Sequence, residues 1–105
     1  MLYKISVPQV ADVEEIRVLE WHREAGEAVE KGDLLVELET HKAIVEVRAG
    51  QKGILRKILA ESGNWQAIGL PLAVLSESES DPVPEDAQAL EHRPRFGVTV
   101  KLHLL

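Results

Sequence analysis

The residues of this chain with the clearest chemical potential lie in one short segment, Glu39-Thr40-His41-Lys42-Ala43. Apolar and polar residues alternate on both sides of it, which predicts two strands joined by a tight hairpin turn over Thr40, His41 and Lys42. Such a turn holds Lys42 at an exposed tip where an enzyme can reach its amine, as a lysine presented for covalent modification requires. Taken alone, however, the pattern favours a lysine that contributes only surface charge.

Other reactive groups are scarce in the sequence. The chain has no cysteine, which excludes disulfides, thiolate zinc sites and cysteine nucleophiles, so thiol chemistry would require a cofactor. Its four histidines lack zinc-site spacing, and no nucleophile elbow, phosphate loop or dinucleotide fingerprint is present. We therefore predict no catalytic residues and no metal site.

Composition narrows the class of partner. The net charge of −6 disfavours general binding to nucleic acid or to anionic membranes, and no apolar run is long enough for a membrane span. A secretory signal is also not evident. We expect a single small domain in the cytoplasm, or in the mitochondrial matrix if the source is eukaryotic.

Positioning such a hairpin requires further strands, and the chain contains six short apolar stretches with a period close to two. They are separated by glycine, proline, asparagine or aspartate, and lie at residues 3–7, 15–21, 34–38, 43–47, 54–59 and 72–75. Short strands at this spacing predict an all-β fold, either a small sandwich or a barrel.

The two halves of this region resemble each other. A shift of 37 residues places Gly26 on Gly63 and Gly32 on Gly69, although Val29 falls on the polar Gln66. A repeated unit of strand, glycine turn and strand predicts a flattened β-barrel of two facing antiparallel sheets with pseudo-two-fold symmetry.

The charge distribution divides the chain into three parts. We expect a domain at residues 1–76, a linker at 77–90 and a tail at 91–105. Residues 76–90 hold five acidic residues and no basic one, and residues 84–92 can form one or two helical turns. From Phe96 to Leu104 the tail alternates apolar and polar residues, which predicts an extra β-strand. Its apolar face needs a cover, so self-association through residues 95–105 is one hypothesis.

The segment Glu39-Thr40-His41-Lys42-Ala43, followed by Val45-Glu46-Val47, resembles the lipoyl-attachment motif of 2-oxo acid dehydrogenase complex acyltransferases. The glycines around it fit the same biotinyl/lipoyl-carrier family. The resemblance implies a flattened barrel with covalent lipoyl attachment at Lys42, a recognition turn of Glu39, Thr40, His41 and Ala43, and both termini at the opposite end. Family members usually carry aspartate in place of His41, and prolines in place of Arg48 and Gly50.

The resemblance also implies a function of carriage, with no enzyme activity in this chain by itself. Lipoylated Lys42 would shuttle acyl groups and electrons between the active sites of a 2-oxo acid dehydrogenase complex. The implied partners are a lipoate ligase or lipoyl transferase, a thiamine-diphosphate decarboxylase, the acyltransferase core and dihydrolipoyl dehydrogenase. Acidic residues near the tip, Glu37, Glu39 and Glu46, are candidates for steering these contacts or simply form a solvated face.

Two alternatives stay open. A biotin carrier of a carboxylase typically places its lysine between two methionines, whereas here His41 and Ala43 flank Lys42 and the only methionine is Met1. The other alternative is an unmodified lipoyl-like adapter module. The sequence does not determine which 2-oxo acid complex is served, nor the oligomeric state.

Overall fold

The computed structural model describes residues 1–10, 12–85, 90 and 92–105. Within these ranges the regular elements are nine β-strands: β1 (Leu2–Ser6), β2 (Glu15–Trp21), β3 (Ala28–Val29), β4 (Leu34–Glu39), β5 (Ala43–Ala49), β6 (Gly53–Ile58), β7 (Trp65–Ala67), β8 (Pro71–Ser76) and β9 (Val98–Leu104). The described residues include no helix long and apolar enough to cross a membrane. The helical turns expected at 84–92 fall mostly outside the described residues.

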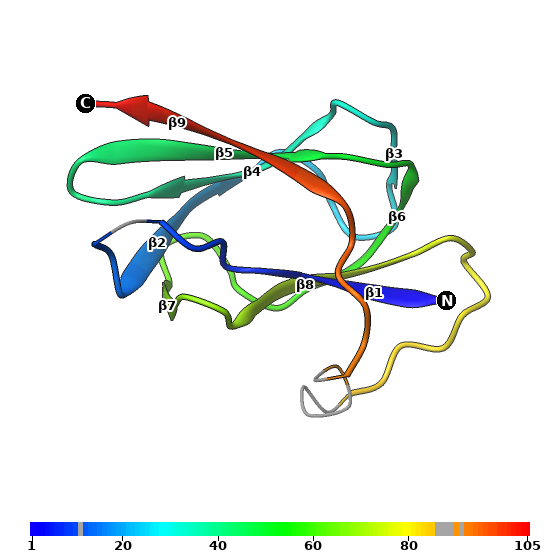
Figure 1. Ribbon diagram of the computed structural model, residues 1–105. Coiled ribbons are helices and arrows are strands. Elements are labelled where there is room, and N and C mark those ends of the chain that lie inside the picture. Colours follow the sequence, from blue (N-terminus) through cyan, green and yellow to red (C-terminus); the bar gives the residue numbers. More distant parts are fainter. Residues whose placement is uncertain (11, 86–89, 91) are drawn as a thin grey trace.

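The strands form two sheets whose neighbouring strands are antiparallel (Figure 1). One sheet has the order β1-β8-β6-β3 and the other has the order β7-β2-β4-β5-β9. The alternating apolar residues of both sheets point into one core, whose largest fully buried members include Ile5, Ile16, Leu35, Leu38, Leu55, Leu72 and Leu75. This confirms the expected all-β class with two facing antiparallel sheets, and it adds the short strands β3 and β7.

The internal repeat is visible in the backbone hydrogen bonds. The Gly26 N–H donates to the Leu55 carbonyl at 2.7 Å, and its counterpart 37 residues later, the Gly63 N–H, donates to the Val18 carbonyl at 2.7 Å. Pairing irregularities also correspond, between Val18 and Glu20 in β2 and between Leu55 and Lys57 in β6. The repeat therefore maps β7-β2-β4-β5 onto β3-β6-β8-β1 and confirms the pseudo-two-fold symmetry.

The turn glycines give a first testable prediction. Gly26 and Gly63 have φ angles of 99° and 92°, and a Cβ added to either would meet nothing within 4 Å. The cost of Gly26→Ala or Gly63→Ala is therefore conformational, and we expect each to lower the free energy of unfolding by about 1–2 kcal/mol. Chemical denaturation measures both. Gly97 cannot serve as the control for these two substitutions. Its φ angle is not positive, but a Cβ added there would lie 2.9 Å from the Gln51 side chain, so its replacement by alanine would also create a steric clash. If the two substitutions lowered the free energy of unfolding by markedly different amounts, this would contradict the structural equivalence of Gly26 and Gly63.

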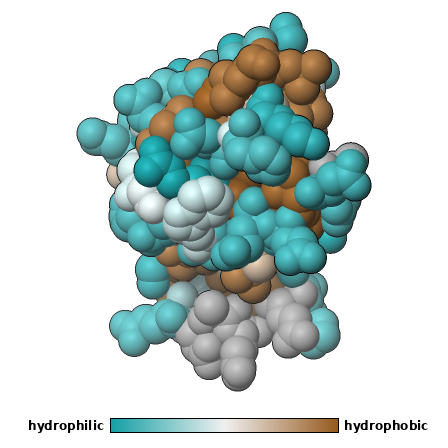
Figure 2. Space-filling model, turned by 90° about the vertical axis from the view of Figure 1, so that its left-hand side faces the viewer, coloured by the Kyte–Doolittle hydropathy of each residue, from teal (hydrophilic) through white to brown (hydrophobic). Residues whose placement is uncertain are grey.

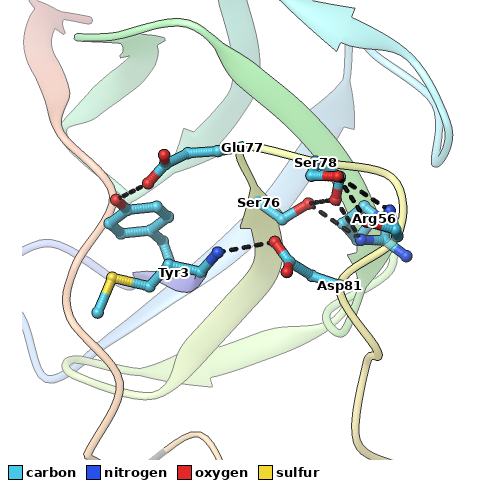
Figure 3. Close-up of polar contacts among 8 residues, drawn as sticks. Tyr3, Arg56, Ser76, Glu77, Ser78 and Asp81 are labelled. Carbon is cyan, nitrogen blue, oxygen red and sulfur yellow. Dashed lines mark hydrogen bonds and ion pairs between the residues drawn. The ribbon is translucent and has the colours of Figure 1, made fainter.

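The two ends of the barrel differ (Figure 1). Leu2 and Ser76 are register partners, so β1 begins and β8 ends at the same end of the barrel, away from the β4–β5 hairpin. Figure 3 shows the polar contacts there: Arg56 donates to the Ser76 hydroxyl at 3.0 Å and to the Ser78 carbonyl at 2.9 Å. The Tyr3 hydroxyl hydrogen-bonds to Glu77, and this bond raises the pKa of Tyr3. These contacts fix the chain where it leaves β8.

β9 then brings the chain back along the whole barrel. It pairs with β5 from Ala49↔Val98 to Ala43↔Leu104, so its last residues lie beside the β4–β5 hairpin (Figure 1). The resemblance, which covered residues 1–76, implied that the termini of the barrel lie at the end opposite the hairpin, and Leu2 and Ser76 do lie there. The tail beyond the barrel instead runs back to the hairpin. The reason is the free edge of β5, which accepts the hydrogen bonds of a further strand.

Candidate functional site

The turn between β4 and β5 is held together by Thr40. Its hydroxyl oxygen accepts hydrogen bonds from the backbone N–H groups of Lys42 at 3.1 Å and Ala43 at 3.0 Å. The Thr40 N–H donates to the Ala43 carbonyl at 2.9 Å, which closes the turn. Thr40 and Ala43 are buried, at 4% and 2% exposure, while His41 and Lys42 are exposed. Because both flanking residues are anchored, the turn presents its two middle side chains from a fixed base.

Removing the Thr40 hydroxyl tests this arrangement. Thr40→Val keeps the side-chain shape but leaves two N–H groups of the turn without their acceptor, so we expect the free energy of unfolding to fall by about 1–2 kcal/mol. Thr40→Ser keeps the hydroxyl and is the matched control, with a smaller loss. Chemical denaturation of both variants checks the prediction, and equal losses would show that the missing methyl group, and not the hydroxyl, matters.

The Lys42 side chain is exposed at this turn. Among the described residues it has no hydrogen-bond or ion-pair partner, so its amine is available to an approaching enzyme. The Lys42 carbonyl, in contrast, accepts a hydrogen bond from the Leu105 N–H at 2.8 Å. The backbone of the lysine is thus held on both sides while its side chain stays accessible.

The acidic residues near the tip are engaged in ion pairs. Glu39 lies 3.3 Å from Arg17, and Glu46 lies 3.1 Å from Arg48 and 3.0 Å from His103. Desolvation raises the pKa of Glu46, but hydrogen bonds and charges from Arg48 and His103 outweigh it and lower the pKa overall. Glu37 contacts His22. The three carboxylates named as candidates for steering partners therefore each contact an arginine or a histidine.

The lowered pKa of Glu46 predicts a pH dependence. Because the folded pKa lies below the ordinary value of 4.5, the group stabilises the fold above that value and loses this contribution as pH falls through the folded pKa. We expect Glu46→Gln to lose stability less steeply than the parent between about pH 5 and pH 3. Denaturation midpoints across this range measure the slope. Glu61→Gln, at an exposed site outside this cluster, is the control for the loss of a surface carboxylate.

A further cluster escaped the sequence analysis. His22 Nε2 lies 2.6 Å from Glu37 Oε1 and 3.3 Å from Glu20 Oε2, and these ligand atoms lie within 4.8 Å of one another. The β2–β4 register places Glu20 directly opposite Glu37, so the histidine bridges two like charges. No spacing in the sequence reveals this group, because it depends on which strands pair.

The geometry of the turn fits the covalent attachment of a group to Lys42. The amine is exposed and unpaired among the described residues, its turn is braced by Thr40, and the barrel lies behind it. The structure brings Glu39, Thr40, His41, Lys42 and Ala43 together as one turn, as expected from their adjacency. The neighbouring strand end at Leu105 was not expected there.

Comparisons with known proteins identify what the chain is similar to. A family model described as "Biotin-requiring enzyme" matches residues 3–75. The succinyltransferase component of the 2-oxoglutarate dehydrogenase complex of Staphylococcus saprophyticus is 34% identical over 93 residues, which is 88% of this chain and 22% of that protein. The pyruvate dehydrogenase protein X component of Mus musculus is 38% identical over 93 residues, 82% of this chain and 18% of that protein.

A solved structure is also similar. The lipoyl domain of the 2-oxoglutarate dehydrogenase complex from Azotobacter vinelandii matches with a TM-score of 0.64 and 32% identity, covering 71% of this chain and 96% of that domain. The present chain spans only about a fifth of the length of the curated relatives. It therefore corresponds to one domain of those proteins, and the family match ends before β9.

Proposed function

The chain belongs to the biotin/lipoyl attachment family, and from this premise we propose that it is a lipoyl carrier domain of a 2-oxo acid dehydrogenase complex. The observation that carries the proposal is the exposed Lys42 amine on a turn braced by Thr40, within the region that the family model matches. A group attached there is presented away from the barrel and can enter the active sites of larger partners.

Lys42 is the proposed attachment residue. The Lys42 ammonium would first lose one proton, and the free Nζ would then form an amide with the carboxyl carbon of activated lipoate, losing a second proton as the activating group leaves. When bound, the lipoyl dithiolane supplies the reversible disulfide and thiol chemistry that the cysteine-free chain lacks. Amide formation also removes the lysine charge. The exposed His41 and the anchored Glu39, Thr40 and Ala43 would form the surface that the modifying enzyme recognises.

In this proposal the barrel carries the lipoyl arm and positions it for the partner enzymes. A rigid turn tethers the arm at a high effective concentration near each active site that the domain visits. The names of the relatives, which are components of 2-oxo acid dehydrogenase complexes, support an acyltransferase core as a partner. A thiamine-diphosphate decarboxylase and a dihydrolipoyl dehydrogenase are the further partners that we propose, with the chemistry performed by these enzymes and not by this chain. A lipoate ligase or lipoyl transferase would perform the modification.

The choice of lipoate over biotin rests on two supports. Relatives are named as dihydrolipoyllysine-residue succinyltransferase or acetyltransferase components, and the similar solved structure is a lipoyl domain. In addition, Lys42 lies between His41 and Ala43 and not between two methionines. The biotin carrier and the unmodified adapter remain the alternatives that an experiment must separate.

Intact-mass and peptide mass spectrometry after co-expression with lipoate ligase, and separately with biotin ligase, separates the three functions. The proposal predicts a lipoyl mass increment on the peptide that contains Lys42 and no biotinyl increment. A biotinyl increment would assign the chain to carboxylases. A bare lysine, with both ligases active on control domains, would leave only the adapter function.

A further inference from the structure

Hydrophilic side chains cover much of the hairpin end of the molecule, below a hydrophobic band along its top (Figure 2). Among the polar groups of the described residues, one combination differs from an ordinary charged surface. Glu20, His22 and Glu37, which we call the β2–β4 cluster, bring one imidazole and two carboxylates together, with their ligand atoms all within 4.8 Å of one another. An imidazole with two carboxylates is a donor set that can bind a transition-metal ion.

The backbone holds the members of the β2–β4 cluster in place. The β2–β4 register pairs Glu20 with Glu37, so their side chains share one face of the sheet. His22 follows the last residue of β2, and its N–H donates to the Leu35 carbonyl at 2.8 Å. The His22 carbonyl accepts a hydrogen bond from Arg23 Nη1 at 2.8 Å. The three side chains therefore project from two paired strands of the barrel and not from a long loop.

The carboxylates of this cluster have no cationic partner that matches their charge. Like charges directly opposite each other on paired strands are destabilising, and Glu20 and Glu37 are such a pair. In the part of the chain that the structure describes, the ion-pair partner of both is His22, and no lysine or arginine contacts either. Glu46, in contrast, contacts both Arg48 and His103. A divalent cation would neutralise the two carboxylates of the cluster.

We propose that the β2–β4 cluster is a zinc-binding site with three protein ligands and a water in the fourth position. Zinc takes histidine nitrogen and carboxylate oxygen at about 2.0–2.2 Å in a tetrahedral arrangement, which sets neighbouring ligand atoms about 3.3 Å apart. Glu20 Oε2 already lies 3.3 Å from His22 Nε2, and Glu37 Oε1 lies 2.6 Å from it. Glu37 therefore needs to withdraw by about 0.7 Å. Magnesium and calcium prefer ligand sets made of oxygen alone.

Zinc binding involves one proton of His22. An ionised carboxylate only accepts hydrogen bonds, so the bond to Glu37 places a proton on His22 Nε2. This proton moves to Nδ1 or leaves to solvent when the Nε2 lone pair binds the metal. The bound ion then links β2 to β4, the strand that leads into the turn of Lys42. Because a ligand that binds the folded chain stabilises it, zinc should raise the temperature of unfolding.

The test is a titration of the full, unlipoylated chain with zinc in competition with a chromophoric chelator. The chain has no cysteine, so no thiolate competes for the metal. We expect one zinc ion per chain, with excess magnesium unable to displace it. Loss of a hydrogen-bond partner of a metal ligand costs about 10–100-fold in affinity, so His22→Gln and Glu20→Gln should each weaken zinc binding by at least about tenfold. The Glu20 side chain is 63% exposed, so Glu20→Gln leaves the core intact.

His103→Gln is the matched control. It removes another histidine that lies beside a carboxylate, Glu46 at 3.0 Å, but outside the β2–β4 cluster, and should leave zinc affinity unchanged. Thermal denaturation provides the second measurement. Zinc should raise the midpoint of the parent and of His103→Gln, and leave that of His22→Gln unchanged.

Two results would overturn the zinc site. Equal zinc affinity in the parent, His22→Gln and Glu20→Gln would show that the ion binds to scattered surface carboxylates. Lower stability of His22→Gln, with no effect of zinc on the parent, would show that His22 serves only as an ion-pair partner of the two glutamates. Because the titrated chain carries no lipoate, neither result bears on the proposed function of Lys42.

Discussion

Lys42→Arg is expected to remove all lipoylation from the chain. Arginine keeps the positive charge and a long side chain, but its guanidinium stays protonated and does not form the amide. Five other lysines, Lys4, Lys31, Lys52, Lys57 and Lys101, remain available in this variant. Intact mass after co-expression with lipoate ligase should match the unmodified chain. A lipoyl increment that persists in this variant would contradict the assignment of Lys42.

A companion variant tests whether position matters as well as residue type. The exchange His41→Lys with Lys42→His keeps the composition and moves the amine by one residue, about 3.8 Å along the chain. Both side chains are exposed, so the fold is not expected to change. Because displacement of a reacting group by 1 Å can cost about a hundredfold in rate, we expect at least that loss in lipoylation. An unaltered rate of lipoylation would show that the ligase does not recognise the position of the lysine within the turn held by Thr40.

The turn at Lys42 could be predicted from the sequence because it is local. Apolar alternation on both sides of three polar residues defines a hairpin without any knowledge of distant contacts. Strands β3 and β7 were missed because two or three residues cannot show a period. The cluster of Glu20, His22 and Glu37 was missed for a different reason, since it forms only through the β2–β4 register.

The tail illustrates another limit of sequence analysis. The alternation of apolar and polar residues in the tail predicts a strand, but it does not predict which strand of the barrel this one pairs with. In the structure β9 pairs with β5 through its backbone, and its leucines stay exposed. The expectation that the apolar face must be buried is therefore not met by the chain itself. Backbone pairing and side-chain burial are separate requirements, and here the β5 edge satisfies only the first.

The attachment of β9 depends on Phe96, which gives the second large prediction. Phe96 is 2% exposed and packs edge-on against Tyr3, with the ring centroids 5.9 Å apart. It also lies so close to Gly53 that a Cβ there would meet the Phe96 ring at 2.8 Å. Its N–H donates to the Lys4 carbonyl at 2.8 Å. The ring thus anchors the chain to the core just before β9 begins.

We expect Phe96→Ala to lower the free energy of unfolding by about 3 kcal/mol, the lower part of the range for a buried phenylalanine. Phe96→Leu keeps most of the apolar volume and should cost less than about 1.5 kcal/mol. Chemical denaturation gives both values. Hydrogen exchange should show that the β9 amides lose protection before those of β2 and β4, because the pseudo-symmetric barrel keeps its own hydrogen bonds without β9.

Phe96→Ala also separates the two parts of the site. Thr40 holds the turn through hydrogen bonds within residues 40–43, none of which involves β9. Lipoylation of Lys42 should therefore persist in Phe96→Ala, although β9 would no longer be held beside the turn. If lipoylation failed while the barrel stayed folded, β9 would be part of the surface that the ligase recognises. Retained lipoylation would instead assign recognition by the ligase to the barrel and its β4–β5 turn alone.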